Sequence, residues 1–240
     1  MEVLNYLLGY KDMKIYQDTE YFNFSLDSVL LANFVTINSK IKKILDIGTG
    51  NAVIPLIMSN RTSVFIDAVE IQKEIYDLAV KSVKLNKLEK QINVYNEDIL
   101  NFYKEKESDV YDIITCNPPF FIKNDNSNLN NNSVKSMARH ELSLKLEDIM
   151  LVSKKLLKNN GRLAVVHRTD RLIDILELMR KHNIEPKKIQ LIYPKENTES
   201  NIVLVEGVKN GNKGLKILHP LVIHTKDNEY TEEVLKYFAN

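Results

Sequence analysis

Residues 43–51 read Lys43-Ile44-Leu45-Asp46-Ile47-Gly48-Thr49-Gly50-Asn51, a short apolar run followed by a turn that carries two glycines. An apolar segment with helical character follows over residues 53–59. Strand, glycine turn and helix, in that order, open a Rossmann-like unit, in which glycines let the backbone approach a ligand at the carboxyl end of the strand. The dinucleotide-binding version needs a further glycine where Val53 stands, so the pattern disfavours a nicotinamide or flavin site.

Acidic residues follow three apolar runs in this part of the chain. Asp46 ends the first run, where a carboxylate suits a ligand with an ammonium group and would repel a pyrophosphate. Glu70 ends the next run, at the place where an α/β nucleotide site holds two ribose hydroxyls with one carboxylate. Asp98 follows a third run and is placed to meet an adenine amino group. Each acid alone would be an ordinary solvated carboxylate, but their order at strand ends predicts a nucleoside-binding site.

A fourth apolar run, residues 111–116, leads directly into Asn117-Pro118-Pro119-Phe120. Neither proline has an N–H group, both have a fixed φ angle, and Pro118 keeps Asn117 out of the helical region. The corner therefore offers the Asn117 side chain and nearby carbonyl groups as hydrogen-bond acceptors. Phe120 adds a flat face on which a planar ring can lie. Such a pocket suits a primary amine on a conjugated group, as in an adenine or an amide.

These motifs resemble those of class I S-adenosylmethionine-dependent methyltransferases of the amino-group subclass, which carry [DNS]-P-P-[YFW]. The chain is more closely similar to the bacterial tRNA adenine-N6 methyltransferases that modify the adenine 3′ of the anticodon in a valine tRNA. Further segments that carry this resemblance are Phe22 to Ala32, Arg139-His140-Glu141, Val166-His167-Arg168, Ile184 to Lys188, Tyr193-Pro194-Lys195 and Val203 to Gly207. Two positions depart from the family pattern: Ala52 replaces a usual glycine, and Phe120 replaces the commoner tyrosine.

The resemblance implies a site, a cofactor and a partner. The cofactor would be S-adenosylmethionine, with S-adenosylhomocysteine as product and no metal, and the partner would be tRNA. The residues expected to bind the cofactor are Asp46, Gly48, Gly50, Glu70, Ile71, Asp98, Ile99 and Asn117. Those expected to form the catalytic corner are Asn117, Pro118, Pro119 and Phe120.

The expected fold class is α/β, a Rossmann-like class I methyltransferase with a mostly parallel seven-stranded sheet, helices on both faces and antiparallel strands at the C-terminal end. Alternation predicts strands over 43–47, 64–69, 91–95, 111–116 and 162–167, with helices over 28–35, 53–59, 72–86, 147–157 and 171–182. The runs 188–193, 201–208 and 215–222 lack long helices between them and predict antiparallel strands. We expect one domain over residues 1–240, with an N-terminal extension over 1–40. A flexible asparagine-rich loop over 123–136 would be either a substrate-ordered lid or an inert insertion.

Composition agrees with a cytoplasmic enzyme. At 240 residues and 44% hydrophobic, the chain can bury a full core. Its single cysteine, Cys116, lies in an apolar run and is expected to be a packing thiol, and no Cys/His cluster has metal-ligand spacing. The start of the chain lacks a basic signal-peptide region, and apolar runs are too short to span a bilayer. We expect no membrane association and no obligate protein partner.

Charge divides unevenly along the chain. Residues 151–216 hold 14 Lys/Arg and 7 Asp/Glu, so this stretch carries +7 and the remainder −6 of a net charge of +1. A basic face of this kind is typical of a polyanion-binding surface, although solvated lysines of an ordinary helix would give the same count. The candidates for RNA contact are Arg139, Arg168, Arg171, Lys187, Lys188 and Lys195. His140 and His167 could assist proton transfer but are expected to be ordinary loop and strand-end histidines.

Three classes of function fit these observations. Methylation of the N6 amino group of an anticodon-loop adenine in tRNA is the leading one. Methylation of a glutamine side chain in a protein, or of an amino group of an rRNA base, would use the same acceptor pair. A non-enzymatic RNA-binding or cofactor-sensing protein is the third class, and the intact Asp46, Glu70, Asp98 and Asn117 argue against it.

Overall fold

The computed structural model of this chain describes residues 1–7, 10, 12–18, 26–119 and 144–238. Its strands are β1 (Glu2–Tyr6), β2 (Lys14–Asp18), β3 (Lys43–Ile47), β4 (Phe65–Glu70), β5 (Ile92–Asn96), β6 (Tyr111–Cys116), β7 (Leu157–Arg168), β8 (Ile184–Lys195), β9 (Ile202–Lys209), β10 (Lys216–Ile217) and β11 (Leu221–His224). Its helices are α1 (Leu26–Phe34), α2 (Val53–Ser59), α3 (Lys73–Leu85), α4 (Ile99–Glu105), α6 (Leu146–Leu156), the 3-10 turn η1 (Thr169–Arg171), α7 (Leu172–Lys181) and α8 (Glu232–Lys236).

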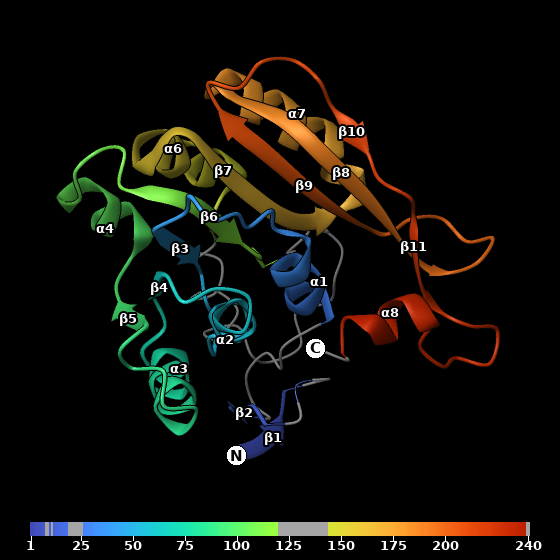
Figure 1. The fold of residues 1–240 in the computed structure, drawn as a ribbon, viewed down its shortest axis with the longest axis horizontal. Helices are drawn as coiled ribbons and strands as arrows, with labels where there is room; N and C mark the ends of the chain where they lie inside the picture. Colours follow the sequence, from blue (N-terminus) through green and yellow to red (C-terminus); the bar gives the residue numbers. More distant parts are fainter. Residues whose placement is uncertain (8–9, 11, 19–25, 120–143, 239–240) are drawn as a thin grey trace, which may run out of the picture.

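A twisted central sheet organises the fold (Figure 1), and its strand order is β10-β8-β9-β7-β6-β3-β4-β5, with β11 also paired to β8. Strands β7, β6, β3, β4 and β5 are parallel neighbours, and β9 runs antiparallel to both β7 and β8. The α/β class, the mostly parallel sheet and the antiparallel pairing near the C-terminus are thus confirmed. The sheet has nine strands instead of seven, because β10 and β11 extend it beyond β8.

The expectation of an antiparallel strand over residues 215–222 is wrong. Two short strands, β10 and β11, occupy this region, and both pair parallel with β8. The run was correctly recognised as extended, but the alternation of apolar residues does not specify which strand it pairs with or in which direction.

Helices cover both faces of the sheet, as predicted. Helices α1, α2, α3 and α8 cover one face of the sheet. They pack against the strand side chains on that face, such as Ile44, Ala164 and Val166. On the other face α4, α6 and α7 pack against residues of alternate parity, such as Leu45, Leu163 and Val165. Strands covered on both sides read as continuous apolar runs, which is why residues 43–47 and 111–116 were recognisable.

The N-terminal segment folds onto the body of the protein. Strands β1 and β2 form an antiparallel hairpin that packs against α3. Asn86 fixes it by exchanging two hydrogen bonds with the backbone of Lys14, at 2.7 and 3.1 Å. The predicted helix over 28–35 is present as α1, shifted by one or two residues at its ends. The single-domain expectation remains a prediction, and the loop over 123–136 lies outside the described residues.

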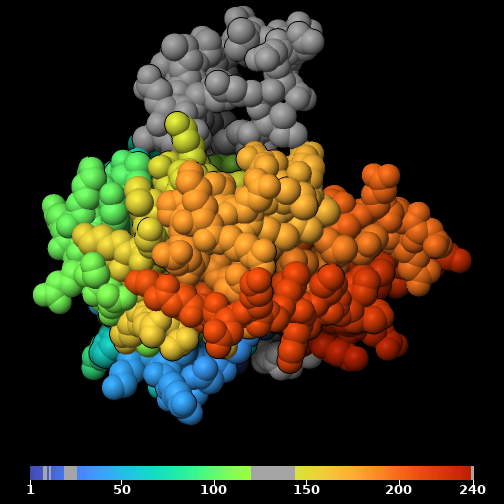
Figure 2. All heavy atoms as spheres, turned by 90° about the horizontal axis from the view of Figure 1, so that it is seen from above, coloured from blue at the N-terminus to red at the C-terminus, as the bar shows by residue number. Residues whose placement is uncertain are grey.

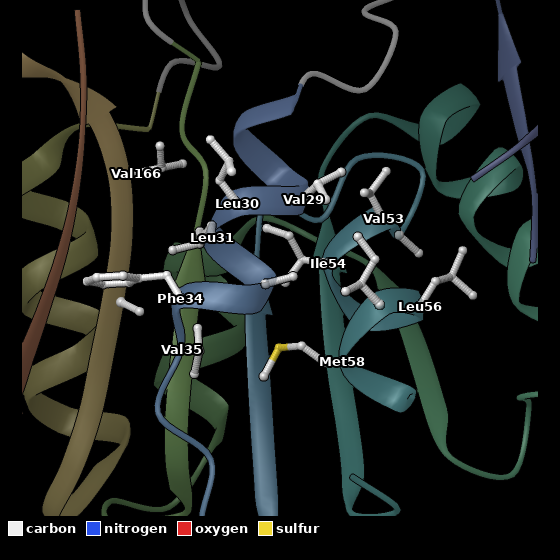
Figure 3. Close-up of a cluster of buried hydrophobic side chains, with 14 of the residues drawn as sticks. Val29, Leu30, Leu31, Phe34, Val35, Val53, Ile54, Leu56, Met58 and Val166 are labelled. Atoms are coloured by element: carbon white, nitrogen blue, oxygen red, sulfur yellow. The ribbon is translucent and has the colours of Figure 1, made fainter. Parts of the chain in front are cut away.

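Helix α1 is mostly apolar and packs beside α2 on one face of the sheet, against β7 and β9. Figure 3 shows its side chains, among them Leu31 and Phe34, within a cluster that includes Val166 of β7 and Ile54 of α2. Arg61 closes the C-terminal end of the helix, because its guanidinium donates to the carbonyl oxygens of Ala32 and, at 2.9 Å, Val35. Those carbonyls have no partner within the helix, so the contact satisfies them and fixes α1 in place.

Candidate active site

The carboxyl ends of β3, β4, β5 and β6 meet at one edge of the sheet. Asp46 at the end of β3 pairs with Ala68 of β4 on one side and with Thr115 of β6 on the other. Glu70 at the end of β4 pairs with Asn96 of β5. Asp98 follows β5 by two residues, and Asn117 directly follows β6. The structure therefore gathers the polar residues predicted from strand ends at a single edge, where open α/β sheets bind ligands.

The glycine turn after β3 adopts a conformation that explains its sequence. Gly48 and Gly50 have φ angles of +64° and +59°, and a side chain added to either would meet no atom within 4 Å among the described residues. The glycines are thus required by backbone conformation, and the space beside them is open to a ligand. Ala52 also has a positive φ, +70°, in the position where the family pattern has glycine, so this residue holds a left-handed conformation with a Cβ atom.

Asp46 is fully buried at the end of β3. Its Oδ1 accepts a hydrogen bond of 2.6 Å from the hydroxyl of Thr115, whereas its Oδ2 has no hydrogen-bond partner among the described residues. The buried hydroxyl of Thr49 lies near this carboxyl group but makes no hydrogen bond of normal distance and angle among the described residues. Burial raises the pKa of Asp46 to about 7; the hydroxyls of Thr115 and Thr49 oppose this rise, and the nearby Glu70 adds to it. A buried carboxylate oxygen without a partner is costly, and a ligand ammonium would relieve that cost.

Glu70 is held by the backbone of two loops. Its Oε2 accepts from the N–H of Gly50 at 3.0 Å, and its Oε1 accepts from the N–H of Gln72 at 2.9 Å. The side chain is 5% exposed, and this burial raises its pKa while the backbone donors oppose the rise. Because both oxygens are fixed between the glycine turn and the loop after β4, their remaining lone pairs point in defined directions, as needed to accept from two hydroxyl groups of one sugar.

The third acid has a structural task of its own. Asp98 caps α4, its Oδ1 accepting from the N–H of Leu100 at 2.8 Å. Ile71 is half-buried in the loop after β4, and Ile99, the first residue of α4, is buried. Asn96 ties this region together by donating to the carbonyl oxygens of Glu70 and Ile71 at 3.0 and 3.1 Å. Two apolar side chains and one acid therefore lie beside Glu70, an environment suited to a base attached to the sugar.

The corner after β6 is tied to helix α1. The Nδ2 atom of Asn117 donates to the hydroxyl of Ser28 on α1 at 2.9 Å. Pro118 is buried and Pro119 is exposed. Phe120 lies outside the described residues, so its stacking role stays a prediction.

Two strand-end residues near this corner have simple structural readings. Cys116 is buried, as expected of a packing thiol, and burial raises the pKa of the thiol well above its ordinary value. His167 lies two residues beyond Val165, which pairs with Cys116 at the end of β6. Its ring is buried, and burial together with the nearby Arg171 lowers its pKa to about 4. His167 is therefore neutral near pH 7. His140 lies outside the described residues.

Sequence reasoning missed three residues that shape the site: Ser28, Thr115 and Asn51. Asn51 is buried and donates from Nδ2 to the carbonyl oxygen of Tyr16 at 3.1 Å, which anchors the glycine turn to the N-terminal hairpin. Thr115 could have been found, because a polar residue in an otherwise apolar buried strand needs a partner. Ser28 and Asn51 gave no such signal, since polar residues are ordinary near helix ends and in turns.

The basic stretch 151–216 forms a broad part of the face seen in Figure 2, where it runs from yellow to orange. Many of its charges are paired with acids: Arg168 with Asp170 at 2.8 Å, and Arg171 with Asp174 at 2.5 Å. Arg168 and Lys195 end β7 and β8 and so lie toward the carboxyl edge of the sheet.

The remaining RNA candidates differ in their surroundings. Lys187 donates to the carbonyl oxygen of Asn212 at 2.9 Å on the exposed surface. Lys188 is directed inward: its ammonium donates to the carbonyl oxygen of Phe34 at 2.6 Å and lies 3.6 Å from the buried Glu206. Burial lowers its pKa, with Glu206 opposing the shift. The structure thus gives Lys188 a packing role that leaves little capacity for phosphate. Arg139 lies outside the described residues.

No three His, Cys, Asp or Glu side chains among the described residues are grouped so that they could hold a metal ion. In the same part of the chain, no helix combines the length and the apolar character needed to cross a bilayer.

Comparison with known proteins supplies the context for this geometry. The family model of the methyltransferase small domain matches residues 25–183. A relative from Flavobacterium psychrophilum, named tRNA1(Val) (adenine(37)-N6)-methyltransferase, is 30% identical over 95% of this chain and 96% of its own length. A relative of the same name from Aliivibrio salmonicida is 26% identical over 90% of each chain. Among solved structures, a protein described as a predicted O-methyltransferase from Agrobacterium tumefaciens superposes with a TM-score of 0.69 at 18% identity, covering 89% of this chain and 96% of that one.

Proposed function

The chain belongs to the methyltransferase small domain family, and we propose that it transfers a methyl group from S-adenosylmethionine to the N6 amino group of an anticodon-loop adenine in tRNA, with a valine tRNA as the suspected substrate. The observation that carries this proposal is the meeting, at one sheet edge, of a buried carboxylate oxygen without a hydrogen-bond partner among the described residues, a carboxylate held by backbone N–H groups, and an asparagine fixed through its Nδ2 atom. The similarity over nearly the whole length of relatives that bear that name supports the choice of tRNA.

The cofactor half of the site would use the three acids in order. Asp46 would accept from the ammonium group of the methionine moiety, with Thr49 beside it as a further polar contact. Glu70 would accept from the two ribose hydroxyls. The base would lie between Ile71 and Ile99, with its amino group toward Asp98. Gly48 and Gly50 would let the methionine moiety lie against the backbone, in the open space beside the turn.

The acceptor half of the site would bind the target amine through its two N–H groups. One N–H would meet the Oδ1 atom of Asn117 and the other the carbonyl oxygen of Pro118. The exocyclic nitrogen of adenine is a weak nucleophile because its lone pair is shared with the ring, and two acceptors on the N–H groups would localise that pair as it leaves the ring plane. Phe120 would stack on the adenine and hold it in line with the methyl group.

These contacts favour the transition state over the ground state. S-Adenosylmethionine supplies, when bound, a methyl group activated by a positively charged sulfur. Positive charge develops on the amine as it is methylated, so hydrogen bonds to Asn117 and Pro118 strengthen during the reaction. Transfer leaves a neutral thioether and a methylated ammonium, which is strongly acidic and loses its proton readily afterwards, so no strong base is required before transfer. A neutral His167 near the end of β7 is compatible with this scheme.

The tRNA would be held by its backbone and read by the pocket. Phosphate contacts position a nucleic acid without selecting its sequence. We assign these contacts to Arg168, Arg171 and Lys195, to Lys187 further from the edge, and to Arg139. Lys188 is not among them, because its ammonium is bonded within the protein. The target adenine must leave its stack to enter the pocket, and an unpaired anticodon-loop base does so at lower cost than a paired one.

Incubation with radiolabelled S-adenosylmethionine tests the function directly. Four acceptors are offered in parallel: bulk tRNA, valine tRNA transcribed in vitro, rRNA and protein extract, each also with the Asn117→Ala variant. Label in tRNA, released as N6-methyladenosine on digestion, is the expected result. Label in protein that is recovered as methylglutamine, or label in rRNA alone, would overturn the proposal in favour of the corresponding alternative.

A further inference from the structure

We propose that Ser28 is a positioning residue that sets the orientation of the Asn117 side-chain amide. The hydroxyl oxygen of Ser28 accepts a hydrogen bond of 2.9 Å from the Nδ2 atom of Asn117, across 89 residues of sequence. This inference rests on the proposed function, in which the Oδ1 atom of Asn117 accepts from the target amine.

The orientation of its side-chain amide decides whether Asn117 can accept a hydrogen bond from the target amine. A carboxamide has one acceptor atom and one donor group, and the two exchange places when the amide turns over. With Nδ2 on Ser28, Oδ1 is the atom left for the incoming N–H group. In the reverse orientation an N–H of Asn117 would face an N–H of the substrate, which is repulsive. The reaction therefore needs one of two orientations of nearly equal shape.

Ser28 stands on a support that cannot easily move. The serine is 8% exposed, and the residues that follow it on α1, from Val29 to Ala32, are 0–2% exposed. These side chains fill the cluster seen in Figure 3, and Arg61 holds the end of the helix. A hydrogen-bond partner on a rigid, buried helix restrains its neighbour more effectively than one on a loop, because its own position costs no further ordering.

The first test compares three serine variants in single-turnover methylation of tRNA. Ser28→Ala removes the hydroxyl without adding volume and should lower the rate by about 5-fold, the factor that one hydrogen bond represents, with affinity for S-adenosylhomocysteine unchanged. Ser28→Thr keeps the hydroxyl and should restore most of the rate. Ser153→Ala is the matched control, since Ser153 is also buried on a helix, α6, whose residues pack on the other face of the sheet. Equal rates for Ser28→Ala and Ser153→Ala would overturn the proposal.

A double-substitution cycle separates orientation from general damage. In the Asn117→Asp variant both side-chain oxygens are acceptors, so turning the group over changes nothing. Beside the aspartate, Ser28 would donate its hydroxyl hydrogen instead of accepting from an amide, so Ser28→Ala should change the rate there by a different factor than it does beside asparagine. The same fold-change in both backgrounds would show that Ser28 supports the structure without orienting the amide.

A spectroscopic measurement decides the matter without any substrate. In ¹⁵N-labelled protein the side-chain NH₂ resonances of Asn117 are identified by their loss in Asn117→Asp. Ser28→Ala should shift the bonded proton and speed its exchange with water, whereas Ser153→Ala should not. Unchanged resonances in Ser28→Ala would refute the orienting bond. If wild-type protein methylates no tRNA, the proposed function fails, and this measurement still reports on the bond itself.

Discussion

Thr115 and Asp46 lie side by side on neighbouring parallel strands, and the threonine hydroxyl donates a 2.6 Å hydrogen bond to only one of the two carboxylate oxygens. The other oxygen is buried and has no partner among the described residues. The pair therefore fixes the direction of the carboxylate and leaves its charge incompletely compensated. An ammonium group arriving from the glycine turn would complete the arrangement.

Cofactor affinity should depend on the ionisation of Asp46. Burial raises the pKa of this carboxyl to about 7, so below that pH the free protein must lose a proton before it can pair with an ammonium group. Affinity for S-adenosylhomocysteine should rise as the pH increases toward 7, level off, and fall above about 8, where an α-amino group loses its own proton. Calorimetry across this range in wild type and Asp46→Asn provides the check. An affinity in wild type that does not change between pH 6 and 7 contradicts the pairing.

The same carboxyl should make the free protein less stable as the pH rises. Between about 4 and 7 the unfolded chain ionises Asp46 while the folded protein keeps it protonated, so stability declines over that window and not beyond it. Asp46→Asn should therefore stabilise the ligand-free protein, and the difference in stability between the variant and the wild type should grow from pH 4 to pH 7. Asp112→Asn is the matched control, since hydrogen bonds from Lys158 and backbone N–H groups outweigh burial and lower the pKa of Asp112. That substitution should destabilise the protein near pH 7, and thermal melts report both effects.

Loss of Glu70 should remove a large part of cofactor binding. Glu70→Ala deletes the carboxylate proposed to accept from the two ribose hydroxyls and should weaken binding of S-adenosylhomocysteine by roughly 1.5–3 kcal/mol. Glu74→Ala, which removes an exposed acid in the first turn of α3, should leave affinity as it is. Titration calorimetry on the three proteins measures the difference, and an unchanged affinity in Glu70→Ala rules out this role.

The acceptor corner should govern the rate more than the binding of cofactor. Asn117→Ala removes the side-chain oxygen proposed to accept from the target amine and should slow methyl transfer by about 10²–10³-fold, with a much smaller change in cofactor affinity. Phe120→Tyr should remain active and Phe120→Ala should lose activity, because stacking is the role proposed for that ring. Single-turnover rates are the relevant measurement. A near-normal rate in Asn117→Ala would refute the mechanism.

Binding of tRNA should be sensitive to salt and to cations near the carboxyl edge of the sheet. Each phosphate contact releases counterions, so the logarithm of affinity should fall against the logarithm of salt with a slope of roughly −0.7 to −0.9 per contact. Replacing Arg171 and Lys195 together by alanine should make the slope shallower and weaken different tRNAs about equally. Lys81→Ala, which removes an exposed cation further along α3 and away from that edge, serves as control. Filter binding at several salt concentrations tests this, and an unchanged slope would leave the basic face a solvated surface.

The predictable part of this protein is the part that burial and backbone geometry dictate. Residues 43–51 and 111–118 could be assigned because strands covered on both faces are apolar throughout and because glycine and proline restrict the turns that follow them. The pairing of β10 and β11 was missed, since a period of two marks a strand but not its neighbour. Lys188 was read as a surface cation because sequence shows charge, whereas its bonds to Phe34 and Thr36 depend on a contact between segments about 150 residues apart.

The position of β9 bears on how this chain folds during synthesis. Because β9 inserts between β7 and β8, the edge of β7 stays uncovered until residues 202–209 have left the ribosome. Glu206 of β9 also accepts a hydrogen bond from the backbone N–H of Thr36, a contact that spans 170 residues. A nascent chain that already holds the glycine turn and the Asn117 corner therefore still exposes an unpaired strand at the middle of its sheet. Such late, long-range closure makes folding slow and exposes the incomplete chain to aggregation, so truncation just before β9 should yield insoluble protein even though every proposed cofactor contact has been synthesised.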